Sequence, residues 1–366
     1  SASMRRRSGP IRRYREVIGL ARANGVIGGQ RRDEQLPAGV RTTLEQAGGI
    51  FVKLGQVAST RSDVLPRTWC DELAELRSSA DPAPREVMHQ HIVAELGAEP
   101  EEVFARFDWE PLASASIAQV YRAEQLDGTQ VVLKVQRPGL DDVVAVDSEA
   151  IRQIARLIER RTQLGLTVRP VELADEFLDG VAEELDFGVE LSNASEMAAG
   201  LAGLDRVRVP AVFPDRSGRR VLTEEFVAAP NVGEHDRLIA AGHDPSEVAE
   251  RVLEAFLHQI FEVGVFHADP HPGNLLVEDD GTIVFIDLGA VGRIGPAHRS
   301  AVLDMLSAAS SGDARLLRQA LTQIAPVDRR VDLRALDAAL ETFLAQHMRA
   351  GGGITAAAFD DLAALI

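Results

Sequence analysis

The segment FHADPHPGNLLVEDDGTIVFIDLG sets polar side chains at fixed distances around two short apolar runs. An Asp-Gly pair separates LLV from TIVFI, and such a pair between apolar runs indicates a two-stranded hairpin. His267, Asp269 and Asn274 come before the hairpin, and Asp287 directly follows it. The segment therefore predicts a hairpin whose flanking loops carry four polar side chains, and this restricts the fold more than the composition does.

The spacing His-x-Asp-x-x-x-x-Asn, followed after a short strand by Asp-x-Gly, is that of the catalytic and metal-binding loops of protein kinases. Phosphoryl transfer needs a carboxylate near the attacking hydroxyl or water, and oxygen ligands that hold Mg²⁺ against the phosphates. We therefore predict Asp269 as the base or orienting group, and Asn274 and Asp287 as metal ligands. A rival interpretation is a hydrolase metal site at His267, Asp269 and His271, which would leave the last two ligands without roles.

Lysine is scarce in this chain, since only Lys53 and Lys134 occur among 39 basic residues. Arginine supplies surface charge equally well, so a retained lysine indicates a need for a compact ammonium on a flexible stem. Lys134 lies in VVLKVQ, the second run of another Asp-Gly hairpin, where alternation places it on one face with Val132. A lysine in a buried strand is costly unless it is paired. In kinases such a lysine binds the α- and β-phosphates and pairs with a glutamate on the next long helix.

The loop before this second hairpin is made of small residues. Kinases have a glycine-rich loop here, whereas this chain has Ala113, Ser114, Ala115 and Ser116. Backbone amides and two hydroxyls could contact phosphates, and the Cβ atoms would make the loop stiffer than glycines do. We expect nucleotide phosphates at this loop, although ASAS alone fits any small-residue turn.

The composition is that of a globular protein with an acidic body. The net charge is −17, and residues 1–32 carry nine arginines and one glutamate, so the remainder carries −25. An acidic body argues against nucleic-acid binding. The single cysteine, Cys70, excludes an internal disulfide and indicates a reducing compartment.

The basic arm MRRRSGPIRRYREVIGLARANGV places Ile11, Tyr14, Ile18 and Ala21 on one helical stripe, with Val17 beside it and arginines on its flanks. The pattern fits a helix on an anionic membrane surface. A helix docked on its own protein with a solvated basic face is the alternative. No run of 18 apolar residues exists. The last residues, AAAFDDLAALI, stop within a helical pattern, so we expect the natural chain to continue, with any anchoring segment lying beyond them.

Taken together, these segments resemble the atypical, protein-kinase-like family of ubiquinone-biosynthesis proteins (UbiB-type, coenzyme Q kinase-like). The matching stretches are FVKLGQVASTRSDVLP, PLASASIAQVYRA, VVLKVQRPG, EELDFGVELSN, FHADPHPGNLLV and FIDLGAV. The resemblance implies an α+β, two-lobed protein-kinase-like fold with an N-terminal helical extension. We expect residues 1–100 to form the basic arm and extension, 101–227 the N-lobe with inserted helices, and 228–366 the C-lobe.

The resemblance also implies a role for the other lysine. The family's K-x-G-Q motif matches Lys53 and Gln56, which are expected to approach the nucleotide site and contact an E-x-D motif, here Glu184 and Asp186. Glu190 matches the helix glutamate that pairs with the strand lysine. On one continuous helix, Glu184 and Glu190 would lie about 120° apart and need not share a partner.

The stretch VLTEEFVAA resembles the family's hinge, in which the backbone faces the adenine. Glu225 and Phe226 match the residues that begin it, but Glu224 replaces the usual methionine. The loop ASAS is also less purely alanine than is usual in the family. This difference in the loop predicts an altered nucleotide preference.

We expect an atypical kinase or ATPase that uses ATP and Mg²⁺, acts on a small or lipid-like molecule and supports isoprenoid quinone biosynthesis at the cytoplasmic side of a membrane. No long activation segment follows Asp287, so a peptide-docking platform and ordinary protein kinase activity are not expected. The expected partners are a nucleotide, a quinone precursor or lipid, an anionic membrane surface and proteins of a biosynthetic complex. The alternative is a catalytically silent, nucleotide-dependent scaffold.

Overall fold

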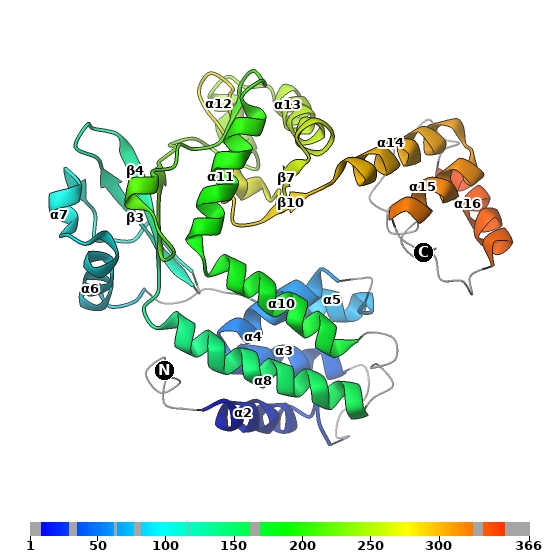
Figure 1. The fold of residues 1–366 in the computed structure, drawn as a ribbon, viewed down its shortest axis with the longest axis horizontal. Helices are drawn as coiled ribbons and strands as arrows, with labels where there is room; N and C mark the ends of the chain where they lie inside the picture. Colours follow the sequence, from blue (N-terminus) through cyan, green and yellow to red (C-terminus); the bar gives the residue numbers. More distant parts are fainter. Residues whose placement is uncertain are drawn as a thin grey trace. The chain divides into compact units, whose positions relative to one another are not determined.

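The computed structural model describes residues 9–28, 35–61, 64–76, 82–115, 117–161, 169–324 and 332–347, with both helices and strands (Figure 1). The chain divides into two compact units. The first comprises Ser1–Ser195, Val209–Pro230 and Val284–Ala290, and the second comprises Glu196–Arg208, Asn231–Ile283 and Val291–Ile366. The three-domain division near residues 100 and 228 stays a prediction.

In the first unit, a small sheet follows a group of helices and has three longer helices between its last two strands. The helices are α2 Pro10–Ala23, α3 Leu36–Ala47, α4 Ile50–Ser59, α5 Arg67–Leu73, α6 Arg85–Leu96, α7 Pro100–Val103, α8 Leu140–Arg161, α10 Pro170–Glu184 and α11 Phe187–Leu201, whose last turns belong to the second unit. The strands are β1 Arg106–Phe107, β2 Ala113–Ser114, β3 Ala118–Glu124, β4 Gln130–Gln136 and β6 Val221–Glu225.

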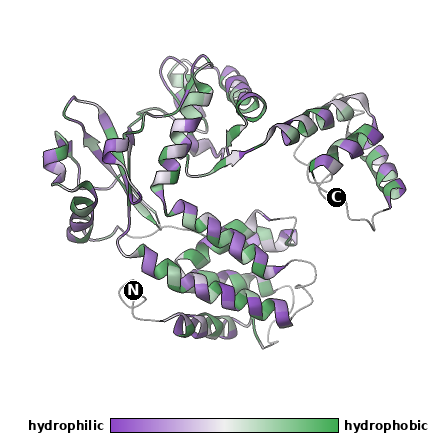
Figure 2. Cartoon of the chain, viewed as in Figure 1, coloured by the Kyte–Doolittle hydropathy of each residue, from purple (hydrophilic) through white to green (hydrophobic). Residues whose placement is uncertain are grey.

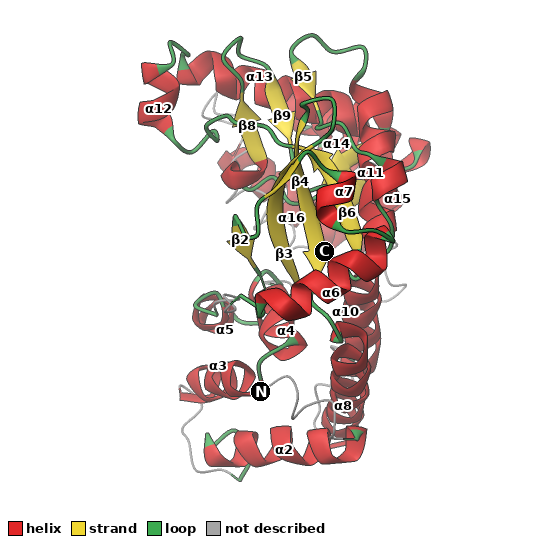
Figure 3. Cartoon of the chain, turned by 90° about the vertical axis from the view of Figure 1, so that its left-hand side faces the viewer, coloured by secondary structure: helices red, strands yellow, loops and turns green. Residues whose placement is uncertain are grey.

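The sheet of the first unit has the order β1-β3-β4-β6, and β2 also pairs with β3. Figure 3 labels β2, β3, β4 and β6 of this sheet. All of these pairs are antiparallel. The predicted hairpin between β3 and β4 is confirmed, and Gly128 in its turn has φ 89°, a left-handed conformation that glycine adopts without strain. One face of the sheet is covered by an apolar cluster that includes Met88 and Ile92 of α6. The inward residues of the sheet in this cluster are Tyr121, Ala123, Val131, Leu133, Val135 and Val221.

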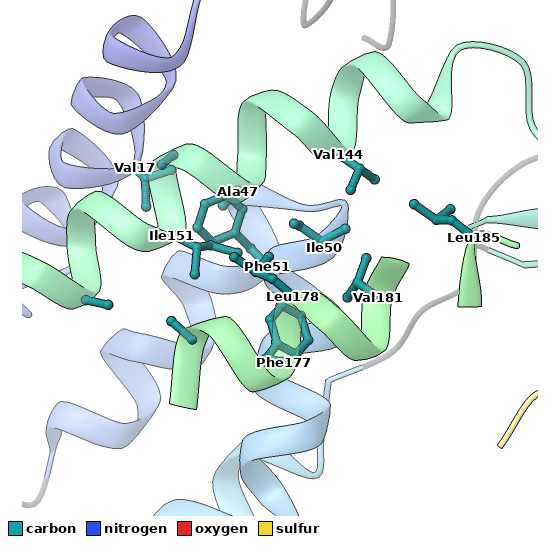
Figure 4. Packing of buried hydrophobic residues seen from close by; sticks show 13 residues of the cluster. Val17, Ala47, Ile50, Phe51, Val144, Ile151, Phe177, Leu178, Val181 and Leu185 are labelled. Atoms are coloured by element: carbon teal, nitrogen blue, oxygen red, sulfur yellow. The ribbon is translucent and has the colours of Figure 1, made fainter. Parts of the chain in front are cut away.

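A second core joins five helices of the first unit, α2, α3, α4, α8 and α10 (Figure 4). Hydrophobic and hydrophilic residues mix along each of these helices (Figure 2), as expected of helices with one buried stripe. Phe51 of α4 lies at the centre of this core, 1% exposed, among residues of α8 and α10. The core therefore fixes the helix that carries Lys53 two residues later.

Helix α2 packs against α8 and α3, as the docked alternative for the basic arm has it. The predicted stripe was partly wrong. Tyr14 and Ala21 do face the protein, but Ile11 is 62% exposed and the buried residues are centred on Arg13 and Val17. The stripe shifts because the arginine has buried partners, which the apolar pattern of the arm does not show.

Arg13 is 0% exposed. Its Nε donates to Oδ1 of Asp147 on α8 at 2.6 Å, and its Nη2 donates to the carbonyl oxygen of Ala47 at 2.7 Å. Its guanidinium lies 5.1 Å from the centroid of the Phe51 ring. A buried charge needs such compensation. The ion pair therefore holds α2 against α8 and against Phe51, in the core that also fixes α4.

The acidic segment 170–201 is not one helix. Helix α10 ends at Glu184, and α11 begins at Phe187. Asp186 lies between them and accepts a hydrogen bond on Oδ1 from the backbone N–H of Gly188 at 2.9 Å, in the manner of a helix N-cap. The predicted angle of 120° between Glu184 and Glu190 was therefore wrong, because the two residues lie on different helices.

The second unit is mainly helical, and its predicted Asp-Gly hairpin is confirmed by Gly281 (φ 82°) between β8 and β9. Its helices are α12 His235–Ala240, α13 Pro245–His258, the π-helix η3 Gln259–Val263, α14 Pro296–Ser311, α15 Ala314–Ile324 and α16 Leu333–His347. Its strands are β5 Val207–Arg208, β7 Val265–His267, β8 Leu275–Val277, β10 Val291–Arg293 and β9 Ile283–Phe285, which crosses the boundary of the units. Strands β5, β9 and β8 form one sheet, and β10 pairs with β7. Within the described ranges, no helix has the length and apolar character needed to span a bilayer.

Candidate active site

Lys134 is the centre of a charged cluster in the first unit. Its Nζ donates to both carboxylate oxygens of Glu190, at 3.0 and 2.8 Å, and to Oδ1 of Asp287 at 3.0 Å. Strand β4 supplies the lysine, the first turn of α11 supplies Glu190, and the loop after β9 supplies Asp287. The pairing implied by the family resemblance is therefore present, and one ammonium holds two carboxylates from distant parts of the chain.

The loop that carries Asp287 is fixed by α11. Asn193 Nδ2, three residues after Glu190 on this helix, donates to the carbonyl oxygen of Leu288 at 2.9 Å. Asp287 has φ 58°, a left-handed conformation that is uncommon outside glycine but several-fold enriched in Asn and Asp. The side chain of Asp287 is 54% exposed, whereas that of Glu190 is 6% exposed. Asp287 is thus the carboxylate that a ligand from solvent can reach.

The charges of this cluster shift one another's pKa values. Burial alone would lower the pKa of Lys134, but the carboxylates of Glu190 and Asp287 outweigh it, so the net shift is upward. Burial raises the pKa of Glu190, and Lys134 opposes that rise. Lys134 is therefore firmly cationic, as a phosphate-binding residue must be.

The K-x-G-Q segment lies on α4, and Lys53 forms an ion pair with Glu184 at the end of α10. Burial lowers the pKa of Lys53; Asp287 opposes this shift and Lys134 adds to it. Both lysines are therefore within electrostatic reach of the same carboxylate.

The rest of the implied K-x-G-Q contact differs from expectation. Gln56 donates from Nε2 to the carbonyl oxygen of Leu76 at 3.1 Å, which fixes the chain that follows α5. The carboxylate of Asp186 caps α11 instead of meeting α4. Of the four motif residues, Lys53 and Glu184 form an ion pair, whereas the side chains of Gln56 and Asp186 form hydrogen bonds with the backbone of Leu76 and of Gly188.

The small-residue loop is braced by an arginine that the sequence did not single out. Arg137, directly after β4, donates from Nη2 to Oγ of Ser114 at 2.7 Å and from Nε to the carbonyl oxygen of Ala115 at 2.8 Å. Ala113 and Ser114 form strand β2, which pairs with β3. The remaining loop residue, Ser116, lies outside the described residues. The Ser114 hydroxyl is thus already a hydrogen-bond acceptor within the loop.

Of the predicted hinge residues, Glu225 is the last residue of β6 and Phe226 directly follows the strand. Glu225 accepts a hydrogen bond on Oε2 from the backbone N–H of Ala211 at 3.0 Å. The N–H of Phe226 donates to the carbonyl oxygen of Gln130 at 2.9 Å, and its ring lies 4.4 Å from the guanidinium of Arg122. The segment is therefore held to β4 up to Phe226.

Glu224 is the residue at which the hinge departs from the family, and its environment is unusual. Burial raises its pKa to about 7, and Glu190 and Asp287 add to this rise while Lys134 opposes it. Between about pH 4.5 and pH 7, the folded chain therefore keeps the proton of Glu224, whereas the unfolded chain, in which the pKa has its ordinary value of 4.5, has released it. Because the folded state binds more protons, the stability contributed at this position falls as the pH rises from about 4.5 to 7.

Replacing Glu224 by glutamine should remove this loss of stability. The variant is expected to be more stable than the wild type above pH 7 by about 2–3 kcal/mol, with the difference vanishing near pH 4. Urea unfolding followed by tryptophan fluorescence at several pH values measures it, because both tryptophans, Trp69 and Trp109, lie in the first unit. Glu102→Gln, at an exposed carboxyl on α7, is the matched control. A difference that does not grow with pH would contradict the prediction.

The second unit contains the loop with the predicted base. Asp269 is exposed, and its carbonyl oxygen accepts a hydrogen bond from Nδ2 of Asn274 at 3.1 Å. This contact orients the amide of Asn274. It leaves the Oδ1 atom, which accepts hydrogen bonds and can bind a metal ion, for other partners. His267 is buried, and its Nδ1 accepts from the N–H of Asp269 at 3.2 Å. The loop is thus folded on itself by its own polar groups.

The rival hydrolase site at His267, Asp269 and His271 finds no support. The Nδ1 atom of His271 accepts a hydrogen bond from the N–H of Gly273 at 3.0 Å and so helps to close a turn. In the part of the chain that the structure describes, no three His, Cys, Asp or Glu side chains are grouped to hold a metal.

Comparison with known proteins decides the family. The profile of the ABC1 atypical kinase-like domain matches residues 75–321, about two thirds of the chain. The chain belongs to the ABC1 atypical kinase-like family. The family expected from the sequence motifs is thereby confirmed, and with it the two-lobed, kinase-like fold of mixed helix and sheet.

Several members of the ABC1 family are similar over most of this chain. ACTIVITY OF BC1 COMPLEX KINASE 7, a chloroplastic protein of Arabidopsis thaliana, is 35% identical over 86% of this chain and 45% of its own length. The probable protein kinase UbiB of Pseudomonas aeruginosa is 35% identical over 85% of this chain and 60% of its own length. The chain thus spans about half the length of these relatives. A solved structure, the Rv3197–erythromycin complex from Mycobacterium tuberculosis, matches with a TM-score of 0.59 and 25% identity over 83% of this chain and 77% of that one.

Proposed function

We propose that this chain binds ATP with Mg²⁺ and either hydrolyses it slowly or transfers its γ-phosphoryl group to a small or lipid-like molecule. The observation that carries the proposal is the cluster in which Lys134 holds Glu190 and Asp287. In the kinase family of folds, a strand lysine paired with a helix glutamate binds nucleotide phosphates, and the Asp of the Asp-x-Gly loop binds the metal.

The donor set supports a magnesium ligand at Asp287. Its carboxylate is more than half exposed and belongs to a loop that α11 holds in place, so a cation can reach it without unfolding the site. Carboxylate and amide oxygens are ligands that Mg²⁺ prefers. When bound, the ion would neutralise charge on the phosphates. Asn274 as a second ligand and Asp269 as the base or orienting group rest on their spacing in the sequence.

Lys53 of the K-x-G-Q motif is proposed to act on the same nucleotide. Asp287 and Lys134 both influence its pKa, which supports a place near the phosphates. In the described structure its ammonium pairs with Glu184. We propose that Glu184 balances the charge of Lys53 while the site holds no nucleotide, and that Lys53 then serves as a second cation for the phosphates beside Lys134.

The proposed biological setting is isoprenoid quinone biosynthesis at the cytoplasmic side of a membrane. The relatives named UbiB support it, since the family resemblance connects these proteins with ubiquinone synthesis. The docked helix α2 keeps Arg12, Arg15 and Arg22 exposed, and such a basic face would suit anionic lipid headgroups. A quinone precursor or lipid and the proteins of a biosynthetic complex are the proposed partners. A nucleotide-dependent scaffold without phosphate transfer remains the second candidate.

Substitution of the strand lysine tests the nucleotide site. Lys134→Ala is expected to weaken Mg·ATP binding about 10- to 100-fold, because charge-assisted hydrogen bonds to the phosphates are lost. Equilibrium titration with a fluorescent ATP analogue measures this, and Arg106→Ala, at an exposed cation on β1, is the control. Equal affinity of wild type and Lys134→Ala would refute the assignment. Turnover of ATP with and without anionic liposomes then separates the enzyme from the scaffold, since the scaffold would bind ATP and never release phosphate.

A further inference from the structure

Glu224 lies on the face of the sheet that carries Lys134. In the antiparallel pairing of β4 with β6, Lys134 is opposite Leu222, and Val132 is opposite Glu224. Residues directly opposite one another point to the same side of a sheet, so these four side chains share one face. Lys134 and Glu224 are diagonal neighbours, roughly 7–8 Å apart.

The carboxyl of Glu224 differs from the other acids of the site in having no cation. Glu190 and Asp287 pair with Lys134, and Glu184 pairs with Lys53. Within the described residues, the Glu224 side chain forms no hydrogen bond or ion pair, although it is half-buried. A carboxyl withdrawn from water without a partner is costly to the fold. Such a group is expected where a ligand supplies the missing partner.

The neighbouring side chains determine on which side of Lys134 a ligand has room. On one side, Leu222 is fully buried in an apolar cluster with Ala118 and Phe187. Next to this cluster, Gln136 is buried and donates to the carbonyl oxygen of Leu185. A nucleotide whose phosphates contact Lys134 therefore extends in the opposite direction along the strands, toward Val132 and Glu224.

The chemistry of a carboxylate distinguishes between bases. Carboxylate oxygens only accept hydrogen bonds, so they suit a base that presents an amino group and oppose one that presents a carbonyl oxygen. Adenine carries an amino group at C6, whereas hypoxanthine and guanine carry an oxygen there. We propose that Glu224 is a specificity-determining residue that selects a 6-amino purine over a 6-oxo purine, an inference that rests on the proposed nucleotide binding around Lys134.

Protonation should modulate this selection. Three charged groups act on Glu224: Glu190 from α11, Lys134 from β4 and Asp287 from the loop after β9. With the pKa of Glu224 near 7, its carboxyl is protonated at pH 6 and ionised at pH 8 in the free protein. A protonated carboxyl can donate to a 6-oxo group, so discrimination between the two kinds of purine is expected to be stronger at pH 8 than at pH 6.

The test compares ATP with inosine triphosphate, which differs at C6 and keeps the same phosphates. Both are titrated with Mg²⁺ into the wild type, Glu224→Gln, Glu224→Met and the control Glu102→Gln, at pH 6 and pH 8. The wild type and the control are expected to favour ATP about 10- to 100-fold at pH 8. Glu224→Gln should bring the two affinities within a few-fold, because an amide can donate as well as accept, and Glu224→Met should lose the preference because it offers no acceptor.

Each result has a separate meaning. A preference for ATP that persists unchanged in both Glu224 variants overturns the inference and leaves ATP binding at Lys134 standing. Failure of the wild type to bind either nucleotide overturns the proposed function and this inference together. A preference that disappears in both variants, while the affinity for inosine triphosphate is kept, supports the inference and shows that the phosphate site is intact.

Discussion

Replacing Asp287, the proposed metal ligand, by asparagine is expected to lower ATP turnover about 10²- to 10³-fold, because the substitution removes the charge that would hold Mg²⁺ at the phosphates. The backbone should tolerate the change. Asp287 has φ 58°, and asparagine adopts that left-handed region readily. Lys134 would keep its two hydrogen bonds to Glu190. The loss should therefore come from the chemistry and not from unfolding.

Phosphate release at saturating Mg·ATP measures the effect of Asp287→Asn, and urea unfolding checks that stability is retained. Asp279→Asn is the matched control, since this carboxyl is exposed in the turn between β8 and β9 and lies outside the proposed site. Full turnover by Asp287→Asn would remove Asp287 from the mechanism. Equal loss in the control would show that the assay responds to something other than the metal site.

The second large effect is expected outside the charged cluster, at the buried arginine of α2. Arg13→Met should lower the free energy of unfolding of the first unit by about 3–5 kcal/mol, because the buried carboxylate of Asp147 would lose the arginine that compensates its charge. Asp147 has a side chain that is 2% exposed, so water cannot replace the arginine. The tryptophan fluorescence of the first unit during urea unfolding reports the change.

A double variant separates the ion pair from simple loss of packing. In Arg13→Met with Asp147→Leu both charges are gone, and a pair replaced by apolar side chains of similar size is often neutral in stability. We therefore expect the double variant to be more stable than Arg13→Met alone. Arg12→Met, at the exposed neighbouring position, should change stability by less than about 0.5 kcal/mol. A double variant as unstable as the single one would mean that the arginine acts mainly through its stem and its contact with Phe51.

Features with a local cause could be predicted from the sequence. The two Asp-Gly hairpins follow from turn chemistry and alternation, and both are confirmed. Lys134 on a strand needed a buried acid, and the family resemblance identified Glu190 as that partner. The kinase-like motif alone, through its spacing from Asp269 and Asn274, identified Asp287 as a candidate site residue. In each case one residue type in one local pattern had few physical alternatives.

Features that depend on distant partners were missed or misread. Nothing in the arm shows that Arg13 meets a carboxylate 134 positions later, although Asp147 lies on the apolar stripe of α8, where an unpaired acid would be costly. The break between α10 and α11 has a local signal, since Asp186 is a favoured N-cap residue, but the acidic run around it conceals that signal. The bracing of the loop by Arg137 depends on the three-dimensional approach of β2 to the end of β4.

The scarcity of lysine gives this protein an inherent chemical label. Its two side-chain primary amines, Lys53 and Lys134, both belong to the proposed phosphate site. Only an unprotonated amine attacks an acylating reagent, so a residue with a lowered pKa reacts faster than one with a raised pKa. The opposite shifts of the two lysines therefore make Lys53 the preferred target of acylation and leave Lys134 protected. A bound phosphate would shield both, so acylation located at Lys53, as distinct from that of the α-amino group, would report the protein molecules whose site is empty.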